Sequence, residues 1–307
     1  MRVTTPAILL FASLSSPVLA LDFGNGFSLN GNVELEYLAS DGDDFSLGWV
    51  DATLGWRSQA GGAVGFGFDL ALDGAKELES GEEFSAFWGG LVVTTAAGDF
   101  TVGAPRPVLD VLYDTPKLGG STLYDLQIQQ FSGPLASYLV KQSDVNAYGI
   151  SFIGTAGDLR YGVYYSQVEG EDADIVQVAG SYRLGNTLIQ GGAEVITLGS
   201  SDDITTVLLA ATHDFDRFSI GAALSDISSS GAPFDGQTIK LFGDYQVTDA
   251  LTLGVQIVSI DTAIDATLYG VSGEYGFGRG GYARLGAFDS DQGSDQAIFD
   301  AAVGFRF

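Results

Sequence analysis

The side chains of this sequence whose type and spacing could support a chemical function, such as attracting cations, are its carboxylates. Aspartate and glutamate together number 39, against 13 lysines and arginines, so the formal net charge is −26. Glu34, Glu36 and Asp51 each lie between two apolar residues. Successive side chains of a strand point to opposite faces, so these carboxylates would share a wet face whose fixed charge attracts cations. A chain this acidic is not expected to bind nucleic acid through a basic face.

Calcium binding is a second chemistry that carboxylates could support. Asp289, Asp291 and Asp295 cluster in one acidic stretch, and Ca²⁺ prefers oxygen ligands of this kind. The stretch does not match the twelve-residue calcium loop between two helices, so a solvated loop without metal is the alternative. Apart from this candidate structural calcium, the sequence predicts no cofactor.

Enzymatic chemistry finds little support in the side chains. The single histidine, His213, lies beside Asp214 and Asp216 at a predicted short turn. A hydrolase triad or a zinc site needs more partners than this neighbourhood offers. We therefore interpret His213 as a solvent-facing turn residue and expect that the protein is not an enzyme.

The elements that must position the carboxylates are strands with one apolar and one polar face. In residues 296–307 the odd positions are all apolar, from Ala297 to Phe307, and the even positions are mostly small or polar. The same repeat predicts sixteen strands, at 27–39, 49–57, 64–72, 84–95, 99–104, 144–154, 159–168, 174–183, 187–197, 204–213, 217–225, 237–246, 251–260, 266–276, 281–288 and 296–307.

The connections between these strands alternate in length. Some are long and acidic, such as 73–83 and 226–236, and others are short, such as 96–98 and 155–158. An outer-membrane barrel has this asymmetry, with long external loops and short periplasmic turns. We therefore predict an all-β fold, a sixteen-stranded antiparallel transmembrane β-barrel that turns its apolar face to lipid and its polar face to a lumen.

The N-terminus predicts export. Residues 1–20 contain Arg2, an apolar run from Ala7 to Leu14 and the small-residue sequence 18–20, which is typical of a cleaved signal peptide. The barrel would then comprise residues 21–307. The absence of cysteine and of any apolar run of eighteen or more residues beyond this segment fits a sheet that carries no disulfides or membrane helix.

One connection, at about 104–143, lacks the strand repeat and contains Pro105, Pro107, Pro116 and Pro134. A loop of this length without secondary structure is usually functional in a compact fold. Because a barrel of this width has an open lumen, we predict that the segment folds inward and narrows the pore.

Three stretches together resemble the general diffusion porins of Gram-negative bacteria, of the sixteen-stranded alphaproteobacterial type. They are 99–104 with 112–114, 260–262 with 269–270, and 303–307. The resemblance implies a homotrimer of water-filled barrels in the outer membrane, which passes small hydrophilic solutes and inorganic ions. It also implies an inward-folded third loop whose acids face arginines on the wall. By position, Asp110, Asp114 and Asp125 would be the loop acids.

The wall arginines of this family are poorly matched here. Arg57 is the one base among the early inward positions, and Arg160 has inward parity near a short turn. The predicted constriction therefore combines the loop acids with Glu34, Glu36, Asp51, Arg57 and Arg160, and we expect a negative lumen that prefers cations. The alternative is that the surplus acid lies on external loops, where salt screens it.

Two other functions remain open at this point. An outer-membrane barrel enzyme would need a catalytic cluster at the rim of the barrel. A secreted soluble β-rich adhesin or binding protein would bury its apolar face instead of exposing it to lipid.

Overall fold

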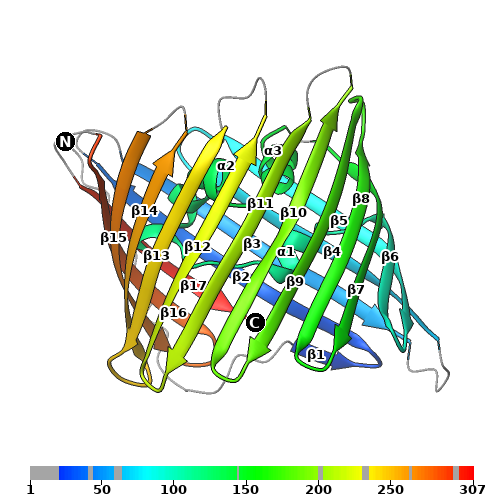
Figure 1. Ribbon diagram of the computed structural model, residues 1–307. Helices are drawn as coiled ribbons and strands as arrows, with labels where there is room; N and C mark the ends of the chain where they lie inside the picture. Colours follow the sequence, from blue (N-terminus) through cyan, green and yellow to red (C-terminus); the bar gives the residue numbers. More distant parts are fainter. Residues whose placement is uncertain are drawn as a thin grey trace.

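The computed structural model describes residues 21–40, 44–58, 64–143, 145–199, 203–229, 235–262, 265–292 and 297–307. The predicted signal peptide lies outside these residues. Within them the chain forms one antiparallel sheet that closes on itself (Figure 1). Sixteen long strands form the wall: β2 (Phe27–Ala39), β3 (Asp44–Arg57), β4 (Gly65–Glu77), β5 (Glu83–Thr95), β6 (Gly98–Ala104), β7 (Ala147–Ala156), β8 (Leu159–Val168), β9 (Ala173–Leu184), β10 (Thr187–Leu198), β11 (Ile204–Phe215), β12 (Phe218–Ser228), β13 (Gly236–Gln246), β14 (Leu251–Asp261), β15 (Asp265–Phe277), β16 (Gly281–Ser290) and β17 (Ile298–Arg306).

Closure occurs between the last strand and the first long one. β17 pairs antiparallel with β2, from Phe299 opposite Ala39 to Arg306 opposite Asn32. A short strand, β1 (Leu21–Gly24), pairs with the start of β2. The sixteen-stranded barrel predicted from the sequence is therefore confirmed. The short β1 was missed because four residues are too few to show the repeat.

The outer surface of the barrel is apolar. On β2, Leu35 is 58% exposed, whereas the neighbouring Glu34 and Glu36 are 3% and 2% exposed on the inner side. Rings gather near the short turns, where Trp56 stacks on Phe68 at 6.1 Å and Phe215 stacks on Phe218 at 4.5 Å. This is the apolar band with aromatic girdles that a membrane-spanning barrel presents to lipid.

No helix in the described part of the chain is long and apolar enough to span a bilayer.

The connection between β6 and β7 enters the barrel, as predicted (Figure 1). It is largely helical, however, so the expectation of a loop without secondary structure was wrong. It contains α1 (Val108–Leu112), the 3₁₀ turn η1 (Leu118–Gly120), α2 (Thr122–Ser132) and α3 (Leu135–Ser143). Helices have a period of 3.6 residues, which explains why no two-residue repeat was visible in this segment. We call residues 105–146 the inner loop.

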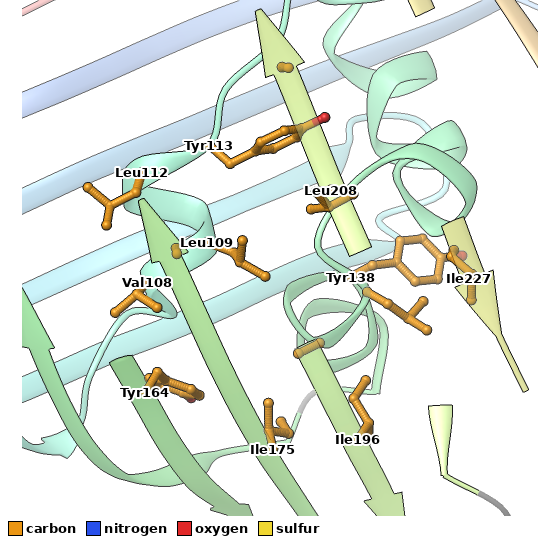
Figure 2. Packing of buried hydrophobic residues seen from close by; sticks show 14 of the residues in the cluster. Val108, Leu109, Leu112, Tyr113, Tyr138, Tyr164, Ile175, Ile196, Leu208 and Ile227 are labelled. Atoms are coloured by element: carbon orange, nitrogen blue, oxygen red, sulfur yellow. The ribbon is translucent and has the colours of Figure 1, made fainter. Parts of the chain in front are cut away.

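The inner loop buries an apolar core inside the lumen. Leu109 and Leu135, both 0% exposed, pack with inward-facing wall residues such as Ile175 and Leu208. Figure 2 shows Leu109 together with other members of this cluster, among them Ile175 and Leu208. A second cluster packs Leu118 of η1 and Ile128 and Phe131 of α2 against the wall. The wall residues in this cluster are Leu38, Val258, Ile260, Leu268 and Phe288. Part of the inner face, predicted to be wet, is therefore apolar, because the loop helices need apolar wall to pack against.

Candidate pore constriction

Glu36 holds the beginning of α2 against the wall. Its Oε1 accepts hydrogen bonds from the Ser121 hydroxyl at 2.6 Å and the Thr122 backbone N–H at 2.9 Å, and its Oε2 accepts one from the Leu123 N–H at 3.2 Å. The first N–H groups of a helix lack partners within the helix and carry a partial positive charge. A carboxylate from β2 therefore satisfies the N-terminus of a helix that follows more than eighty residues later.

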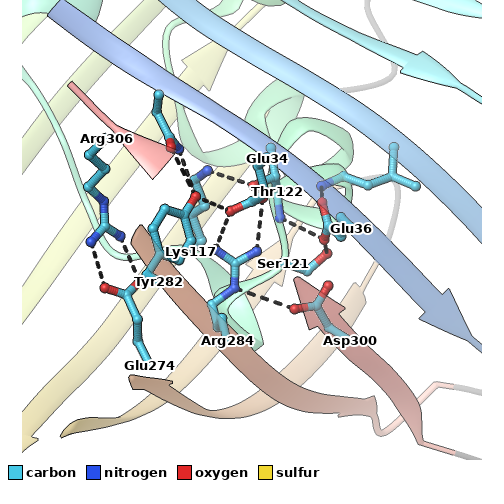
Figure 3. A network of polar contacts seen from close by, with 12 residues as sticks. Glu34, Glu36, Lys117, Ser121, Thr122, Glu274, Tyr282, Arg284, Asp300 and Arg306 are labelled. Atoms are coloured by element: carbon cyan, nitrogen blue, oxygen red, sulfur yellow. Dashed lines mark hydrogen bonds and ion pairs between the residues drawn. The ribbon is translucent and has the colours of Figure 1, made fainter. Parts of the chain in front are cut away.

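Glu34, two residues earlier on the same face, joins a buried network (Figure 3). The Arg284 guanidinium donates to both of its oxygens, at 2.9 and 3.1 Å, and the Tyr282 and Thr122 hydroxyls each donate at 2.5 Å. Arg284 also donates from Nε to Asp300 at 3.4 Å. The bidentate pairing of Arg284 with Glu34 allows these two charges to remain buried. Two predicted constriction acids, Glu34 and Glu36, thus anchor the inner loop.

Asp51 and Asp73 anchor the opposite part of the inner loop. The Arg106 guanidinium donates to both oxygens of Asp51, at 2.8 and 3.0 Å, and lies 3.5 Å from Asp73. The Lys141 ammonium lies 2.5 Å from Asp73. Arg106 precedes α1 and Lys141 belongs to α3, so Asp73 fastens both ends of the inner loop to β4.

The three predicted loop acids have different environments. Asp110 accepts a hydrogen bond from the Ser137 hydroxyl at 2.6 Å, and its burial raises its pKa, although Lys141 and Arg106 oppose the shift. Asp125 lies 3.7 Å from the ammonium of Lys240 on β13. Asp114 is exposed to the lumen. Enclosure within the barrel and the charge of Asp125 raise the pKa of Asp114.

A cavity of about 680 Å³ brings together Asp51, Asp110, Arg57 and Arg160. Arg57 is committed to Asp69, to which it donates at 2.7 and 2.8 Å. These four predicted residues therefore share one space between β2–β8 and the start of the inner loop. Glu34 and Glu36 lie apart from it, in the Arg284 network, and Asp114 and Asp125 lie toward Lys240.

Several residues that shape this region escaped the sequence analysis. They are Asp73, Lys141, Gln177, Glu194, Lys240, Arg284 and Asp300. Glu194, for example, is fully buried and accepts hydrogen bonds from the Ala136 N–H of α3 at 3.0 Å and from Gln177 at 2.5 Å. Inward parity within a predicted strand marks Glu194, Lys240 and Arg284, but parity alone does not identify their partners on the loop.

The pairing reverses the arrangement that the resemblance implied. Here the wall supplies acids, such as Asp51 and Asp73, and the loop supplies the bases Arg106 and Lys141. Lys240 and Arg284 are wall bases, of which Lys240 reaches a loop acid, Asp125. The loop is therefore held mainly by wall carboxylates.

The candidate calcium stretch lies at the end of β16 and beyond it. Asp289 and Asp291 bind neighbouring backbone, since Asp289 accepts from the Ser290 N–H at 2.8 Å and Asp291 from the Thr267 N–H at 2.7 Å. Asp295 lies outside the described residues. Among the described residues, no group of three potential ligands could hold a metal ion.

A closed barrel with an apolar outer wall and a charged loop folded into its lumen defines a membrane channel protein. Comparison with known proteins specifies the class. The profile of the Gram-negative porin family matches residues 5–294, and the chain belongs to that family.

Individual relatives agree with this assignment. A porin of Rhodobacter capsulatus is 24% identical over 300 residues, which cover 87% of this chain and 95% of that protein. Two solved structures share the fold. A multiply substituted Rh. blastica porin has a TM-score of 0.67 at 18% identity, and a porin structure refined at 1.8 Å has a TM-score of 0.65 at 20% identity. Each match covers 92% of this chain and all of the solved chain. The chain is thus similar to alphaproteobacterial porins, and as a member of the Gram-negative porin family it is a channel of the outer membrane.

Proposed function

We propose that this porin lets small hydrophilic solutes and inorganic ions diffuse passively through its lumen, with a preference for cations. We also propose that residues 1–20 are removed on export and that the porin works as a homotrimer, as the family resemblance implies. Binding of calcium by Asp289, Asp291 and Asp295 is a secondary proposal. Asp289 and Asp291 alone are too few ligands, so Asp295 would have to complete the site.

The charge around the inner loop supports the cation preference. The carboxylates there are Glu34, Glu36, Asp51, Asp69, Asp73, Asp99, Asp110, Asp114, Asp125, Glu194 and Asp300, against the bases Arg57, Arg106, Lys117, Lys141, Arg160, Lys240 and Arg284. Carboxylates therefore exceed bases at the level where the lumen is narrowed. In a narrow passage with low-dielectric walls, such an excess concentrates cations.

The observation that carries this proposal is the exposure of the Asp114 carboxylate without an ion-pair partner among the residues that the structure describes. Among the described acids of the inner loop it is the exposed one, and no lysine or arginine of the described chain lies within ion-pair distance of it. Asp51, Asp73 and Asp125 are all engaged in ion pairs. Asp114 therefore presents a carboxylate to passing ions.

Zero-current potentials across planar bilayers test this proposal. With purified porin and a KCl gradient, we expect the sign that indicates cation preference. Asp114→Asn should reduce the cation-to-anion permeability ratio by about two- to fivefold, since one fixed charge at moderate distance in an aqueous pore changes the ion energy by about 0.5–1 kcal/mol. The matched control is Asp216→Asn, which removes a charge at an exposed turn outside the lumen and should leave the ratio unchanged.

Two results would contradict the proposal. Anion preference of the unmodified porin would refute the sign of the lumen field. A permeability ratio that is equal in Asp114→Asn and the unmodified porin would remove Asp114 from the ion path.

A further inference from the structure

The turn η1 touches the barrel wall where β15 and β16 carry glycine on their inner faces. A Cβ atom added to Gly286 would lie 1.8 Å from the carbonyl oxygen of Gly119, and one added to Gly270 would lie 2.5 Å from the Gly119 nitrogen. Both distances are well below the closest approach of real side-chain carbons. Backbone of the inner loop therefore lies directly against backbone of the wall, without a side chain between them.

Larger side chains surround this contact on both sides. On β16 the inward row reads Arg284, Gly286, Phe288, and both large side chains are buried. Phe288 lies opposite Gly270 in the strand register. The two glycines thus form a gap in an otherwise bulky surface, and η1 fills that gap. We call Gly270 and Gly286 the wall socket.

Polar contacts fix the turn in the wall socket. The Gly119 N–H donates to Oε1 of Gln256 on β14 at 3.0 Å, and Gln256 lies directly opposite Gly270. Leu118 is completely buried beside Leu268 and Phe288. Gly119 and Gly120 have φ angles of +58° and +79°, a conformation that glycine adopts without strain. These contacts together fix the position of η1 against the wall.

We propose that the wall socket sets the width of the pore, by deciding how far the inner loop extends from the wall toward the barrel axis. This inference rests on the proposed channel function. Since the wall is continuous hydrogen-bonded sheet and cannot yield outward, a side chain at position 270 or 286 must displace η1 into the lumen. Lys117 and the segment before it, which includes Asp114, would move with the turn. The socket glycines are positioning residues, because they act on the passage through the loop.

Gly286→Ala tests the proposal in single-channel recordings. We expect a lower conductance per channel and a steeper loss of permeation for the larger of two uncharged sugars in liposome swelling. A variant that was merely less stable would give fewer channels, each with the conductance of the unmodified porin.

Gly276→Ala is the matched control. Gly276 lies on the inner side of the same strand β15, and a Cβ there would have its nearest contact at 3.9 Å, with the Ala250 carbonyl oxygen. This variant should conduct like the unmodified porin. Gly270→Ala is the second socket variant, in case Gly286→Ala does not fold.

The outcomes separate this inference from the channel function itself. If the unmodified porin forms no channels, the proposed function fails. If it forms channels and a folded socket variant keeps both the conductance and the size dependence, the socket proposal is overturned. Failure of both socket variants to fold, with Gly276→Ala intact, would assign the glycines to barrel assembly and would also overturn it.

Discussion

At the scale of single residues, the inner loop stays inside the barrel because buried charges are matched between the loop and the wall. Asp73 and Lys141 have side chains only 5% and 7% exposed, and Arg106 adds a second positive charge to Asp73. Ion pairs on the surface contribute little, whereas an unmatched charge left in a buried position is costly. Loss of Asp73 should therefore weaken the attachment of both ends of the inner loop to β4.

Replacing Asp73 by asparagine tests this assignment. Asp73→Asn leaves the Lys141 ammonium buried without its partner, and we expect the free energy of unfolding to fall by about 3 kcal/mol. Urea unfolding of the porin in lipid vesicles measures the change. Lys76→Met is the control, because its partner Glu83 and Lys76 itself are both about 60% exposed, so their pair should contribute at most about 1 kcal/mol. Equal stability of Asp73→Asn and the unmodified porin would show that Arg106 and Lys141 do not need this carboxylate.

At the scale of elements, α2 depends on a carboxylate outside its own segment. Its N-cap residue Ser121 accepts from the Tyr124 N–H at 3.2 Å, and Glu36 receives the remaining donors at this end. Glu36 thus supplies a carboxylate to this first turn from another element, while the acid of α2 itself, Asp125, faces Lys240. The orientation of α2 is thereby tied to β2.

Glu36→Gln tests the role of this charge. Glutamine keeps the shape and one acceptor oxygen but removes the negative charge, so the start of α2 should lose about 1–2 kcal/mol. We expect hydrogen exchange of the Thr122 and Leu123 amides to accelerate by about tenfold. Glu274→Gln removes a carboxylate that binds Arg306 near the short turns, and it should not change the exchange of these amides. Unchanged exchange in Glu36→Gln would mean that the hydrogen bonds suffice without the charge.

The elements also show what the sequence could and could not predict. Strands such as 159–168 were predicted with their bounds, because the barrel exposes one face to lipid and period-two patterning follows directly from that. The helices at 122–132 and 135–143 were not predicted, since their apolar residues pack on the wall and on the rest of the loop, which the local pattern does not reveal. Parity and resemblance named the candidate site acids. Their partners Arg284 and Lys141 lie far away in sequence, and only closure of the barrel brings them together.

At the scale of the whole molecule, the field of the lumen should depend on pH. Burial raises the pKa of Asp110 above the ordinary value of 3.8, and enclosure within the barrel together with the charge of Asp125 raises that of Asp114. As the pH falls, both should therefore take up protons before aspartates outside the barrel do, and the cation preference should weaken at pH values above 3.8. Permeability ratios across a pH series measure this, and Asp114→Asn should show a smaller change. An unmodified porin whose ratio stays constant until ordinary carboxylates titrate would contradict it.

The same shift has a defined sign for stability. Because the folded chain binds a proton on Asp110 more tightly than the unfolded chain does, this group favours folding below pH 3.8, and its contribution is lost as the pH rises through the raised pKa. The ion pairs of Arg106 and Lys141 with wall carboxylates act in the opposite direction at acidic pH, because they require ionised acids.

The two ends of the described chain meet on one edge of β2. Phe307 exchanges backbone hydrogen bonds with Gly31 of β2. Leu21 lies opposite Leu29, which precedes Gly31 by two residues on the same strand. β1 therefore continues the line and direction of β17. A linker of very few residues could join Phe307 to Leu21, and the resulting cyclic polypeptide could be opened at any long connection. Circular permutation would therefore leave the hydrogen bonds between every pair of neighbouring strands in place.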